Sequence, residues 1–587
     1  MADVTRGLDR WITDTEISTR FPYYTRANAD EVGPEPFSPL GWSLGWVQGC
    51  IPGVAKGFVA FGVLEPDEFA VDPPEVFGNW GGYFYNQLSL PRVMGVRMPG
   101  ASPEAIDLAY FGDHPGVPAY TPHPADENEA QSAKLVETMG WVMSTDGFPA
   151  QEEASRSAMR VVDERPDLAS LSNTELVARA RQLAGPELDA AWTAYCQSAL
   201  GASLGPGAVQ AICGALGRGA DAVKVMTAIG GIESADAPVA MWEISRTIKN
   251  SPGLMAEFDA GVDGLLERLH ASTDLEATSL LGQWDDLIAH HGHRGPNEWD
   301  LRAHSWTTKP SMPMGMLERL RHQDDSKSPA EAHARGVVVR EQLTLELLAL
   351  VDGDPEAHGG LQAGIRSASV FYGLREMGKN ACIRLIHEAK LAVMEIGQRL
   401  VADGVIDDVQ QIFMLVDDEV DNFLADPSAM SALIRERDAV FQQLGTLDPP
   451  YIVKLEEGVL PISEWPKRGA SEGEPAAAGD VLQGAMGSPG VVTGVARVVL
   501  DPADPGAIGP GDIMIAPTTD PSWVPLFLAA EGVVVNVGAV ASHAAIMCRE
   551  LGIPCAVSVI DATSRIPDGA TIEIDGSTGV VTIVSVP

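Results

Sequence analysis

The sequence predicts a multidomain α+β protein. Its 587 residues exceed what one hydrophobic core supports, so the chain should divide into several units. From about residue 170 to residue 453 the apolar residues recur at helical spacing. The stretch from Gln483 to Pro587 instead consists of short β-branched runs between glycine turns. These observations predict a large domain over residues 1–463, a linker over 464–482 and a β-rich domain over 483–587.

The first part of the chain, to about residue 165, is rich in Trp, Pro and Gly and has few long periodic stretches. We expect a mixed α/β region here, in which strands and loops line a pocket. Six aromatic side chains of this region could stack on a flat substrate, or they could be ordinary core residues. They are Trp42, Trp46, Trp80, Tyr83, Phe84 and Tyr85.

Amphipathic helices are predicted for the rest of the large domain, because apolar residues recur there at i, i+3 and i+4. The first of them opens with Ser172-Asn-Thr-Glu175, which has the pattern of a capping box. The predicted helical segments are 173–181, 252–269, 274–290, 328–350, 361–403 and 428–444.

The linker over 464–482 is rich in Gly, Pro, Ala and charge and has no periodicity. A flexible chain of about 17 residues has an r.m.s. span of about 20–25 Å and a contour limit of about 60 Å, which suits a domain that swings between two sites. The strands expected after the linker are 491–492, 496–499, 513–516, 533–537, 571–574 and 580–584.

The composition favours a soluble protein of the cytoplasm. Hydrophobic residues make up 45% and charged residues 21%, as in soluble globular proteins, and no uncharged apolar run is long enough for a bilayer. The N-terminus has no pattern of a secretory leader, and the six cysteines form no CxxC pair, which indicates a reducing compartment. The net charge of −41 argues against nucleic acid and anionic membranes as partners. It serves solubility, or it provides a face for a basic partner subunit.

The most informative segment is Gly538-Ala-Val-Ala-Ser-His543-Ala-Ala, which continues as a helix to Gly552-Ile-Pro554. An apolar strand and a glycine turn precede it, so the segment delivers one histidine to the start of a helix. Free N–H groups and the positive dipole end of a helix hold phosphate oxygens, and an imidazole there can act as a nucleophile. Gly538 lets the backbone approach the phosphate without a Cβ in the way.

This segment resembles the mobile phosphohistidine domain of the phosphoenolpyruvate-utilising enzymes, whose pattern is Gly-Gly-x-Thr-Ser-His-Ala-Ala. The resemblance extends to Gly487-Ser-Pro-Gly490 and to the Thr-Asp-Pro-Ser-Trp run that begins at Thr519, and covers about 100 residues in all. It departs at Ala539 and Ala541, where the family usually has glycine and threonine. The resemblance implies a swivelling β/β/α domain that carries a phosphoryl group on His543.

The segment His290-His-Gly-His293-Arg294-Gly-Pro-Asn-Glu298 is a second candidate. Its histidines could suggest a metal, but they cannot all face one ion on a regular helix, and no matched carboxylates are spaced for one. We therefore predict no metal site. The segment instead resembles the His-Gly-His-Arg-Gly-Pro-x-Glu pattern in the substrate domain of rifampin phosphotransferase and its relatives.

Arg375 and Lys379 lie at i and i+4 of a long predicted helix and so share a face. Such cations repel unless an anion lies between them; a solvated charged face is the alternative. Arg375-Glu376-Met-Gly-Lys379 resembles the Arg-Glu-x-x-Lys of the same family, which is implicated in phosphoryl transfer. Asn28-Ala-Asp-Glu31 and Ser38-Pro39 resemble the family's opening motifs.

Two modules of the larger family members have no counterpart in this sequence: the ATP-grasp module and the C-terminal barrel that binds pyruvate. The arrangement resembles one subunit of a split dikinase-type phosphotransferase, such as phenylphosphate synthase or the hydroxyacetophenone phosphotransferases. This resemblance implies that a separate ATP-grasp subunit, with ATP and Mg²⁺, phosphorylates His543. The group then passes to a small hydroxylated aromatic (phenolic) acceptor, giving AMP, phosphate and an aryl phosphate. Transfer to a non-phenolic hydroxyl, such as that of an antibiotic, or to another protein remains open.

The chemistry assigns a role to each candidate residue. His543 is the nucleophile and carrier, and Arg375 and Lys379 neutralise charge on the transferring group. His293 is the candidate base for the acceptor hydroxyl, because the pKa of an ordinary histidine lies near neutrality. Arg294 and Glu298 orient this base or bind phosphate. Ser542, Gly538 and Glu376 complete the expected phosphate- and substrate-binding set.

Overall fold

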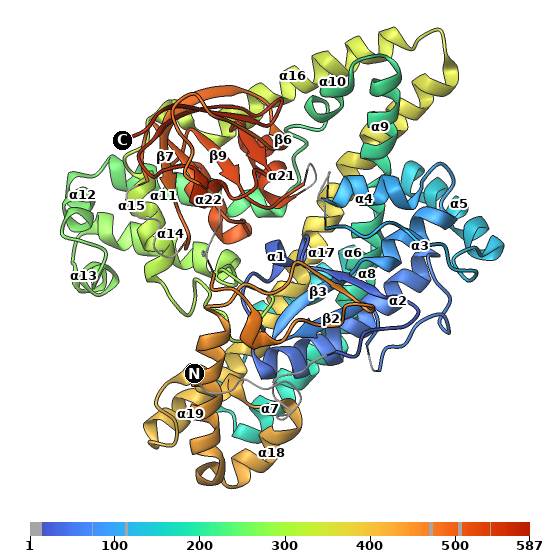
Figure 1. The fold of residues 1–587 in the computed structure, drawn as a ribbon. Helices are drawn as coiled ribbons and strands as arrows, with labels where there is room; N and C mark the ends of the chain where they lie inside the picture. The colour runs from blue at the N-terminus through green and yellow to red at the C-terminus, as the bar shows by residue number, and fades with distance from the viewer. Residues whose placement is uncertain (1–14, 73, 112–115, 469–473, 503–507, 540–541) are drawn as a thin grey trace. The chain divides into compact units, whose positions relative to one another are not determined.

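The fold is described from a computed structural model, shown in Figure 1, that covers residues 15–72, 74–111, 116–468, 474–502, 508–539 and 542–587. The chain forms two compact units, each built from three separate stretches of sequence. Unit 1 contains residues 1–204, 297–303 and 370–470, and unit 2 contains residues 205–296, 304–369 and 471–587. As predicted, the protein is multidomain α+β, with a mostly helical body and a β-rich C-terminal part.

Unit 1 contains a small antiparallel sheet with the strand order β2-β3-β1-β4. Its strands are β1 (Tyr23–Thr25), β2 (Phe77–Trp80), β3 (Tyr83–Gln87) and β4 (Ile452–Lys454). Tyr24 pairs with Val453, so a strand from the end of the helical body closes a sheet built by the first ninety residues. This pairing ties the two ends of unit 1 together.

The N-terminal part of unit 1 is more helical than the sequence indicated. Its longer helices are η1 (Gly41–Cys50, a π-helix), α2 (Ile51–Phe61), α3 (Ser89–Arg97), α4 (Pro103–Phe111), α5 (Glu129–Ser144) and α6 (Pro149–Asp163). The physical reason is clearest in η1 and α2. Both are mostly buried and apolar, with scattered glycines, so they lack the polar stripe that reveals a surface helix in a sequence.

Of the remaining helices of unit 1, those over residues 173–182 and 427–444 match predicted segments. These remaining helices are α1 (Ala29–Val32), η2 (Leu168–Ser170), α7 (Asn173–Gln182), η3 (Leu183–Glu187), α8 (Leu188–Gly201), η6 (Val409–Met414), α18 (Asp417–Ala425), α19 (Pro427–Leu444) and η7 (Ile462–Glu464). The capping box predicted at the start of α7 is confirmed, because Ser172 and Glu175 cap each other's backbone. The long helix α17 (Pro355–Ala402) contributes its second part, from Val370, to unit 1.

Unit 2 combines a second set of helices with the β-rich domain. The helices are α9 (Leu204–Ala215), α10 (Gly219–Lys224), η4 (Glu233–Ala235), α11 (Asp236–Lys249), α12 (Pro252–Asp259), α13 (Leu265–Ala271), α14 (Leu275–His291), α15 (Ser311–Leu320), η5 (Asp325–Lys327) and α16 (Pro329–Leu350). Helices α9, α10, α16 and the first part of α17 share one apolar cluster that includes Val209, Leu347 and Leu361.

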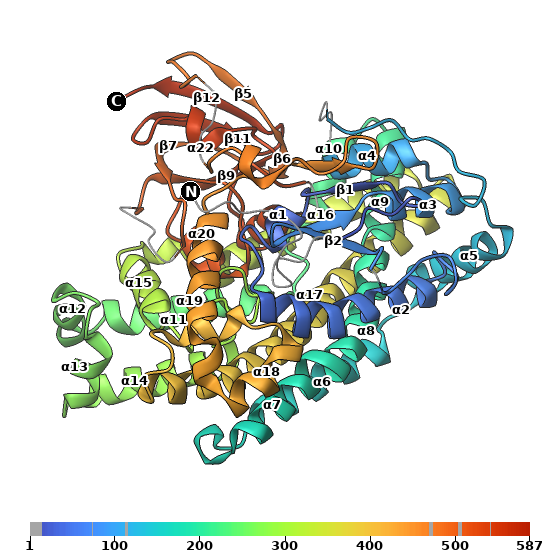
Figure 2. The ribbon, with the colours of Figure 1, turned by 60° about the horizontal axis from the view of Figure 1, so that its bottom comes forward.

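The β-rich domain is an eight-stranded sheet with the order β5-β12-β11-β7-β8-β9-β10-β6, in which β5 and β12 lie at one edge (Figure 2). Its strands are β5 (Val481–Gln483), β6 (Ala485–Ser488), β7 (Val491–Val498), β8 (Asp512–Ala516), β9 (Gly532–Val535), β10 (Cys555–Val557), β11 (Thr571–Asp575) and β12 (Val580–Ser585). Strands β7 to β10 are parallel neighbours, joined through η8 (Pro521–Trp523), α20 (Val524–Phe527) and α21 (His543–Leu551).

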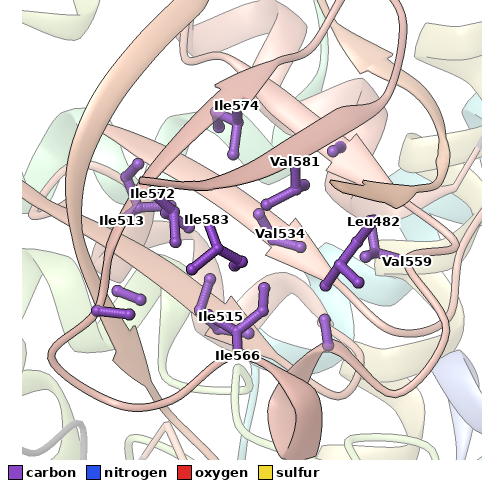
Figure 3. Packing of buried hydrophobic residues seen from close by; sticks show 14 of the residues in the cluster. Leu482, Ile513, Ile515, Val534, Val559, Ile566, Ile572, Ile574, Val581 and Ile583 are labelled. Atoms are coloured by element: carbon purple, nitrogen blue, oxygen red, sulfur yellow. The ribbon is translucent and has the colours of Figure 1, made fainter. Parts of the chain in front are cut away.

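Branched aliphatic side chains from these strands converge in one core (Figure 3). Ile515, Val534 and Ile583 are fully buried there, next to Ile566 at the end of the short helix α22 (Ala562–Arg565). This core fixes strand β9, and β9 leads directly toward α21.

Much of the segment assigned to the linker is hydrogen-bonded where the structure describes it. Trp465 is buried and donates its indole N–H to Leu460 O. Ala476 lies in the core of the β-rich domain, and its N–H donates to Arg565 O. Residues 469–473 of the linker lie outside the described part of the chain. The boundary at residue 483 and the swinging role of the linker stay predictions.

Within the described residues, none of the helices has the length and apolar character needed to cross a membrane.

Candidate phosphohistidine site and its polar surroundings

His543 is the first residue of α21, as the sequence predicts. Ser542 is its N-cap, and the Ser542 hydroxyl accepts a hydrogen bond from Ala545 N at 3.5 Å. Both side chains are buried, with 6% of His543 and 5% of Ser542 exposed. The first turn of α21 therefore has the backbone N–H groups and the positive dipole end that a phosphate-binding site beside a histidine would need.

Gly538 is closely packed where the chain turns toward α21. A Cβ on Gly538 would lie 3.1 Å from Ser542 Oγ, the atom that caps the helix, and 3.3 Å from Val557 Cβ. The hydroxyl of Ser558 also donates to Gly538 O. Ala541, one of the departures from the family pattern, lies outside the described residues.

The other end of α21 is joined to the upstream Gly487-Ser-Pro-Gly490 motif. Arg549 is buried and donates from Nε to Gly487 O at 2.7 Å. Gly552 then ends the helix in the left-handed conformation, with φ of 68°. Residues that are 62 positions apart in sequence are thus joined at this helix.

The His-Gly-His-Arg motif lies at the end of α14, where Gly292 and Gly295 make a tight turn. A Cβ on Gly292 would lie 2.3 Å from Thr307 Oγ1, and one on Gly295 would lie 2.0 Å from His304 O. The turn buries His293 and Arg294, which are 5% and 1% exposed. The Nη2 atom of Arg294 donates to Ser234 Oγ at 3.4 Å, and Ser234 belongs to η4, which contacts α21. Unit 2 thus connects Arg294 to the helix of His543 through η4.

The histidines of this motif do not converge. The Nδ1 atom of His290 is within 2.8 Å of Asp286 O, in its own helix, and its side chain is exposed. Among the residues that the structure describes, no group of three or more His, Cys, Asp or Glu side chains is arranged to hold a metal ion.

The cations Arg375 and Lys379 of α17 lie in unit 1, and each has a carboxylate partner. Arg375 Nη1 is 2.6 Å from Glu376 Oε1, and Lys379 Nζ is 3.3 Å from Glu298 Oε1. Burial works to lower the pKa of Arg375, but Glu376, Tyr195 and Glu31 outweigh it and raise this pKa above its ordinary value. The anions that relieve the repulsion between the two cations are therefore residues of the protein.

Two motifs from the start of the chain lie near the polar residues of unit 1. The electrostatic effect of Glu31 on Arg375 places the Asn28-Ala-Asp-Glu31 motif beside the helix. The second motif, Ser38-Pro39, contacts Asp300. The hydroxyl of Ser38 donates to Asp300 Oδ1 at 2.6 Å, and its N–H donates to Asp300 Oδ2 at 3.0 Å. Burial raises the pKa of Asp300 despite these hydrogen bonds.

Lys390 is a member of this polar cluster that the sequence reasoning missed. It is 1% exposed, and burial lowers its pKa from 10.5 to about 8, against the opposing effects of Asp300 and Glu298. A signal for it was present in the sequence. Lys390 follows Lys379 by 11 residues, or three helical turns, which places both on one face of α17.

A second buried histidine, His387, lies in the same region. Burial lowers its pKa well below the ordinary value, and the cations Lys390 and Arg165 lower it further. The adjacent Glu388 is fully buried and accepts hydrogen bonds from Arg165 and Arg179. His387 is therefore a neutral group at physiological pH.

The aromatic side chains of the N-terminal part pack on one another. Trp42 and Trp46 stack with their ring centroids 5.7 Å apart, and Trp46 also contacts Phe84 at 4.5 Å. All six aromatic residues singled out in the sequence are at most 3% exposed. Of the two interpretations, this burial favours ordinary core residues over a platform for a flat substrate.

Two family models match the chain. Residues 191–376 match the rifampicin phosphotransferase fourth domain, and residues 508–579 match the mobile domain of PEP-utilising enzymes. The second match contains His543, and the first contains His293, Arg294, Glu298 and Arg375.

Several curated proteins are similar to the chain. A rifampicin phosphotransferase of Streptomyces sviceus is 30% identical over 355 residues, which cover 59% of this chain and 39% of the relative. A rifampicin phosphotransferase of Bacillus subtilis is 28% identical over 303 residues, covering 51% of this chain and 34% of the relative. An uncharacterised protein of Mycobacterium tuberculosis is 26% identical over 603 residues, covering 97% of this chain and 62% of the relative.

The chain spans between about a third and two thirds of the length of these relatives. The site geometry and the matches agree on the C-terminal domain, because the helix that begins at His543 lies inside the matched mobile domain. The chain therefore carries the mobile domain of the PEP-utilising enzymes and is related to the rifampicin phosphotransferases.

Proposed function

We propose that this protein is a phosphotransferase that carries a phosphoryl group on His543 and passes it to the hydroxyl of a small-molecule acceptor. The observation that carries the proposal is the position of His543. It begins a capped helix of nine residues in a domain that matches the mobile domain of PEP-utilising enzymes. Phosphate oxygens are stabilised at such a position, and an imidazole nitrogen can form and release a P–N bond.

In the transfer step the acceptor oxygen forms a bond to phosphorus while the P–N bond to His543 breaks. Arg375 and Lys379 neutralise charge on the equatorial oxygens, and His293 takes the proton of the hydroxyl. Arg294 and Glu298 bind phosphate or orient the base. Within unit 1, Glu298 supports this assignment by holding Lys379 Nζ at 3.3 Å.

The proposed source of the phosphoryl group is ATP, with Mg²⁺, bound by a separate ATP-grasp subunit. ATP, water and the acceptor hydroxyl then give AMP, phosphate and the phosphorylated acceptor. The support is the match of residues 508–579 to the mobile domain of PEP-utilising enzymes, because a mobile domain can be loaded at one site and transfer the group at another.

Two acceptor classes remain. A phenol is one, because its pKa of about 10 makes its hydroxyl easier to activate than an aliphatic one. The hydroxyl of an antibiotic such as rifampicin is the other, and the names of several relatives favour it. The burial of the N-terminal aromatic residues removes one reason for a flat phenolic substrate.

The test separates loading of the histidine from transfer. The purified chain is treated with phosphoramidate, a reagent that phosphorylates histidine side chains, and the modified residue is mapped by mass spectrometry. Phenol or rifampicin is then added and its phosphorylation is followed. We expect acid-labile phosphate on His543, its loss to one acceptor, and neither event at this position in His543→Asn.

Two further outcomes decide the finer points. Loading without transfer to either acceptor would contradict a small hydroxyl acceptor of these classes and favour a phosphocarrier that acts on another protein. Addition of a separately expressed ATP-grasp subunit with Mg-ATP should replace phosphoramidate and release AMP. Loading from ATP by the chain alone would contradict a donor subunit in trans.

A further inference from the structure

Within unit 2, the carboxylate of Glu550 is held by a loop of the helical part. Its Oε1 atom accepts from Ile229 N at 2.8 Å, and its Oε2 atom accepts from Gly230 N at 3.2 Å. His333 of α16 adds a third contact, with Nδ1 3.5 Å from Oε2. Glu550 is only 5% exposed, so these contacts compensate a buried charge.

The loop is shaped for an anion. Ala228, Gly230 and Gly231 all have φ in the left-handed region, at 52°, 78° and 68°. Such a turn points successive N–H groups toward one point and makes a concave anion site. For the non-glycine residue Ala228 this conformation costs about 1–2 kcal/mol, so packing must maintain it.

Helix α16 supplies that packing. The side chain of Arg340 donates to Ala228 O, and a Cβ on Gly336 would lie 2.7 Å from Ala228 Cβ. Helix α16 also contacts α21. We call the loop 228–231 together with His333 the carboxylate seat.

The seat lies on the side of α21 that also carries His543. Glu550 follows His543 by seven residues, which is about two helical turns, so both lie on one face of α21. The chain that leaves the seat at Gly231 continues into η4, which contacts α21, and Ser234 of η4 accepts from Arg294. One continuous segment thus joins the carboxylate of Glu550 to the guanidinium of Arg294.

We propose that Glu550 is a positioning residue: its carboxylate, bound in the seat, holds α21 in the register that presents His543 to η4 and Arg294 for phosphoryl transfer. This inference rests on the proposed function. It adds a residue that touches neither the phosphoryl group nor the acceptor and acts only through the placement of α21. A misplacement of about 1 Å at a reacting centre can reduce a rate by about 10²-fold.

The first measurement is hydrogen exchange, which does not depend on any activity. In the wild-type chain the amides of Ile229 and Gly230 are bonded to Glu550 and should exchange slowly. In Glu550→Ala we expect their exchange to accelerate by about tenfold or more. Unchanged protection in this variant would overturn the seat, whatever the protein's activity is.

The second measurement follows loading of His543 and transfer from it separately. Loading of His543 by phosphoramidate, a freely diffusing reagent, should be the same in the wild type and Glu550→Ala, and thermal unfolding of both proteins checks that the variant remains folded. Transfer from phosphorylated His543 to rifampicin or phenol should fall by about 10–100-fold. Glu550→Gln keeps one acceptor oxygen, so its rate of transfer should lie between those of the wild type and Glu550→Ala.

A matched control is Lys327→Met. Lys327 forms an ion pair with Glu531 that also joins the helices to the β-rich domain, but its side chain is 41% exposed and the pair does not involve α21. We expect transfer within about twofold of the wild type, because exposed ion pairs contribute little.

Equal transfer in Glu550→Ala and wild type would overturn the positioning role. Absence of transfer in every protein, including the wild type, contradicts the proposed function. In that case hydrogen exchange by itself still tests whether Glu550 is bound by Ile229 and Gly230.

Discussion

At the scale of single residues, the most informative group is a buried lysine that the sequence reasoning did not select. Lys390 is 1% exposed and lies near Asp300 and Glu298. Desolvation disfavours its charged form, and the two carboxylates only partly restore it, so its pKa falls to about 8. The ion pair of Lys379 with Glu298 is part of the same cluster, so the charge of Lys390 influences the proposed transfer residues.

The lowered pKa of Lys390 predicts a specific pH dependence of stability. Between pH 8 and 10.5 the folded state has lost the proton of Lys390 while the unfolded state still binds it. A rise in pH through this window therefore stabilises the folded state, by about 1.4 kcal/mol per pH unit. Denaturant unfolding of the wild type and Lys390→Met at several pH values should show this extra rise only in the wild type. If the free energy of unfolding changes with pH in the same way in both proteins, the lowered pKa of Lys390 is contradicted.

At the scale of elements, a row of glycines explains how two helices of unit 1 approach each other. Gly49, Gly53 and Gly57 recur every fourth residue along η1 and α2, on the side that faces η3 and α8. A Cβ on Gly53 would lie 2.4 Å from Trp192 Cβ and 2.7 Å from Asp189 O. The absence of side chains here allows close contact between backbones, and it also hides the helical period from sequence analysis.

This packing predicts opposite effects for two glycine substitutions. Gly53→Ala should lower the free energy of unfolding by about 1–3 kcal/mol, because the added methyl group overlaps α8. Gly45→Ala is the matched control in η1, since no atom lies within 4 Å of its added Cβ. Alanine there should be neutral or slightly stabilising, by up to about 1 kcal/mol. Thermal unfolding of both variants gives the comparison, and equal destabilisation would argue against the close contact.

At the scale of the whole molecule, the proposed reaction draws on both units. His543 and its helix belong to unit 2, whereas Arg375, Lys379 and their carboxylate partners belong to unit 1. Loading of His543 by a small reagent needs only His543 and its helix. Transfer to an acceptor needs the cations as well, because charge develops on the phosphoryl oxygens in the transition state.

Lys379→Met should therefore separate the two half-reactions. We expect phosphoramidate to load His543 at the wild-type rate, while transfer to rifampicin or phenol falls by about 10²–10³-fold. Lys327→Met, which alters an exposed lysine away from this cluster, serves again as the control for loss of a positive charge. An equal loss of loading and transfer in Lys379→Met would show a general structural defect and contradict the assigned role.

The sequence predicted the local features of the site. The position of His543 at the start of a helix follows from Ser542, a strong N-cap residue, and from the glycine turn that ends an apolar strand. Helices α7, α14, α16, α17 and α19 follow from the helical spacing of apolar residues, and strands β7, β8, β9, β11 and β12 follow from β-branched runs between glycine turns. These features depend on residues within a few positions of each other, so a single sequence contains them.

What only the tertiary structure decided is which distant residues meet and how deeply they are buried. Glu31 beside Arg375, Ser38 bonded to Asp300 and Glu550 in its seat are each separated by more than 200 residues from their partners. No local period encodes these contacts, because they arise from the packing of whole elements. Burial likewise sets the pKa of Lys390, since desolvation depends on everything that surrounds the ammonium group and not on its neighbours in the chain. The sequence by itself therefore determined which residue we propose as the carrier, and the packing determined the groups that surround it.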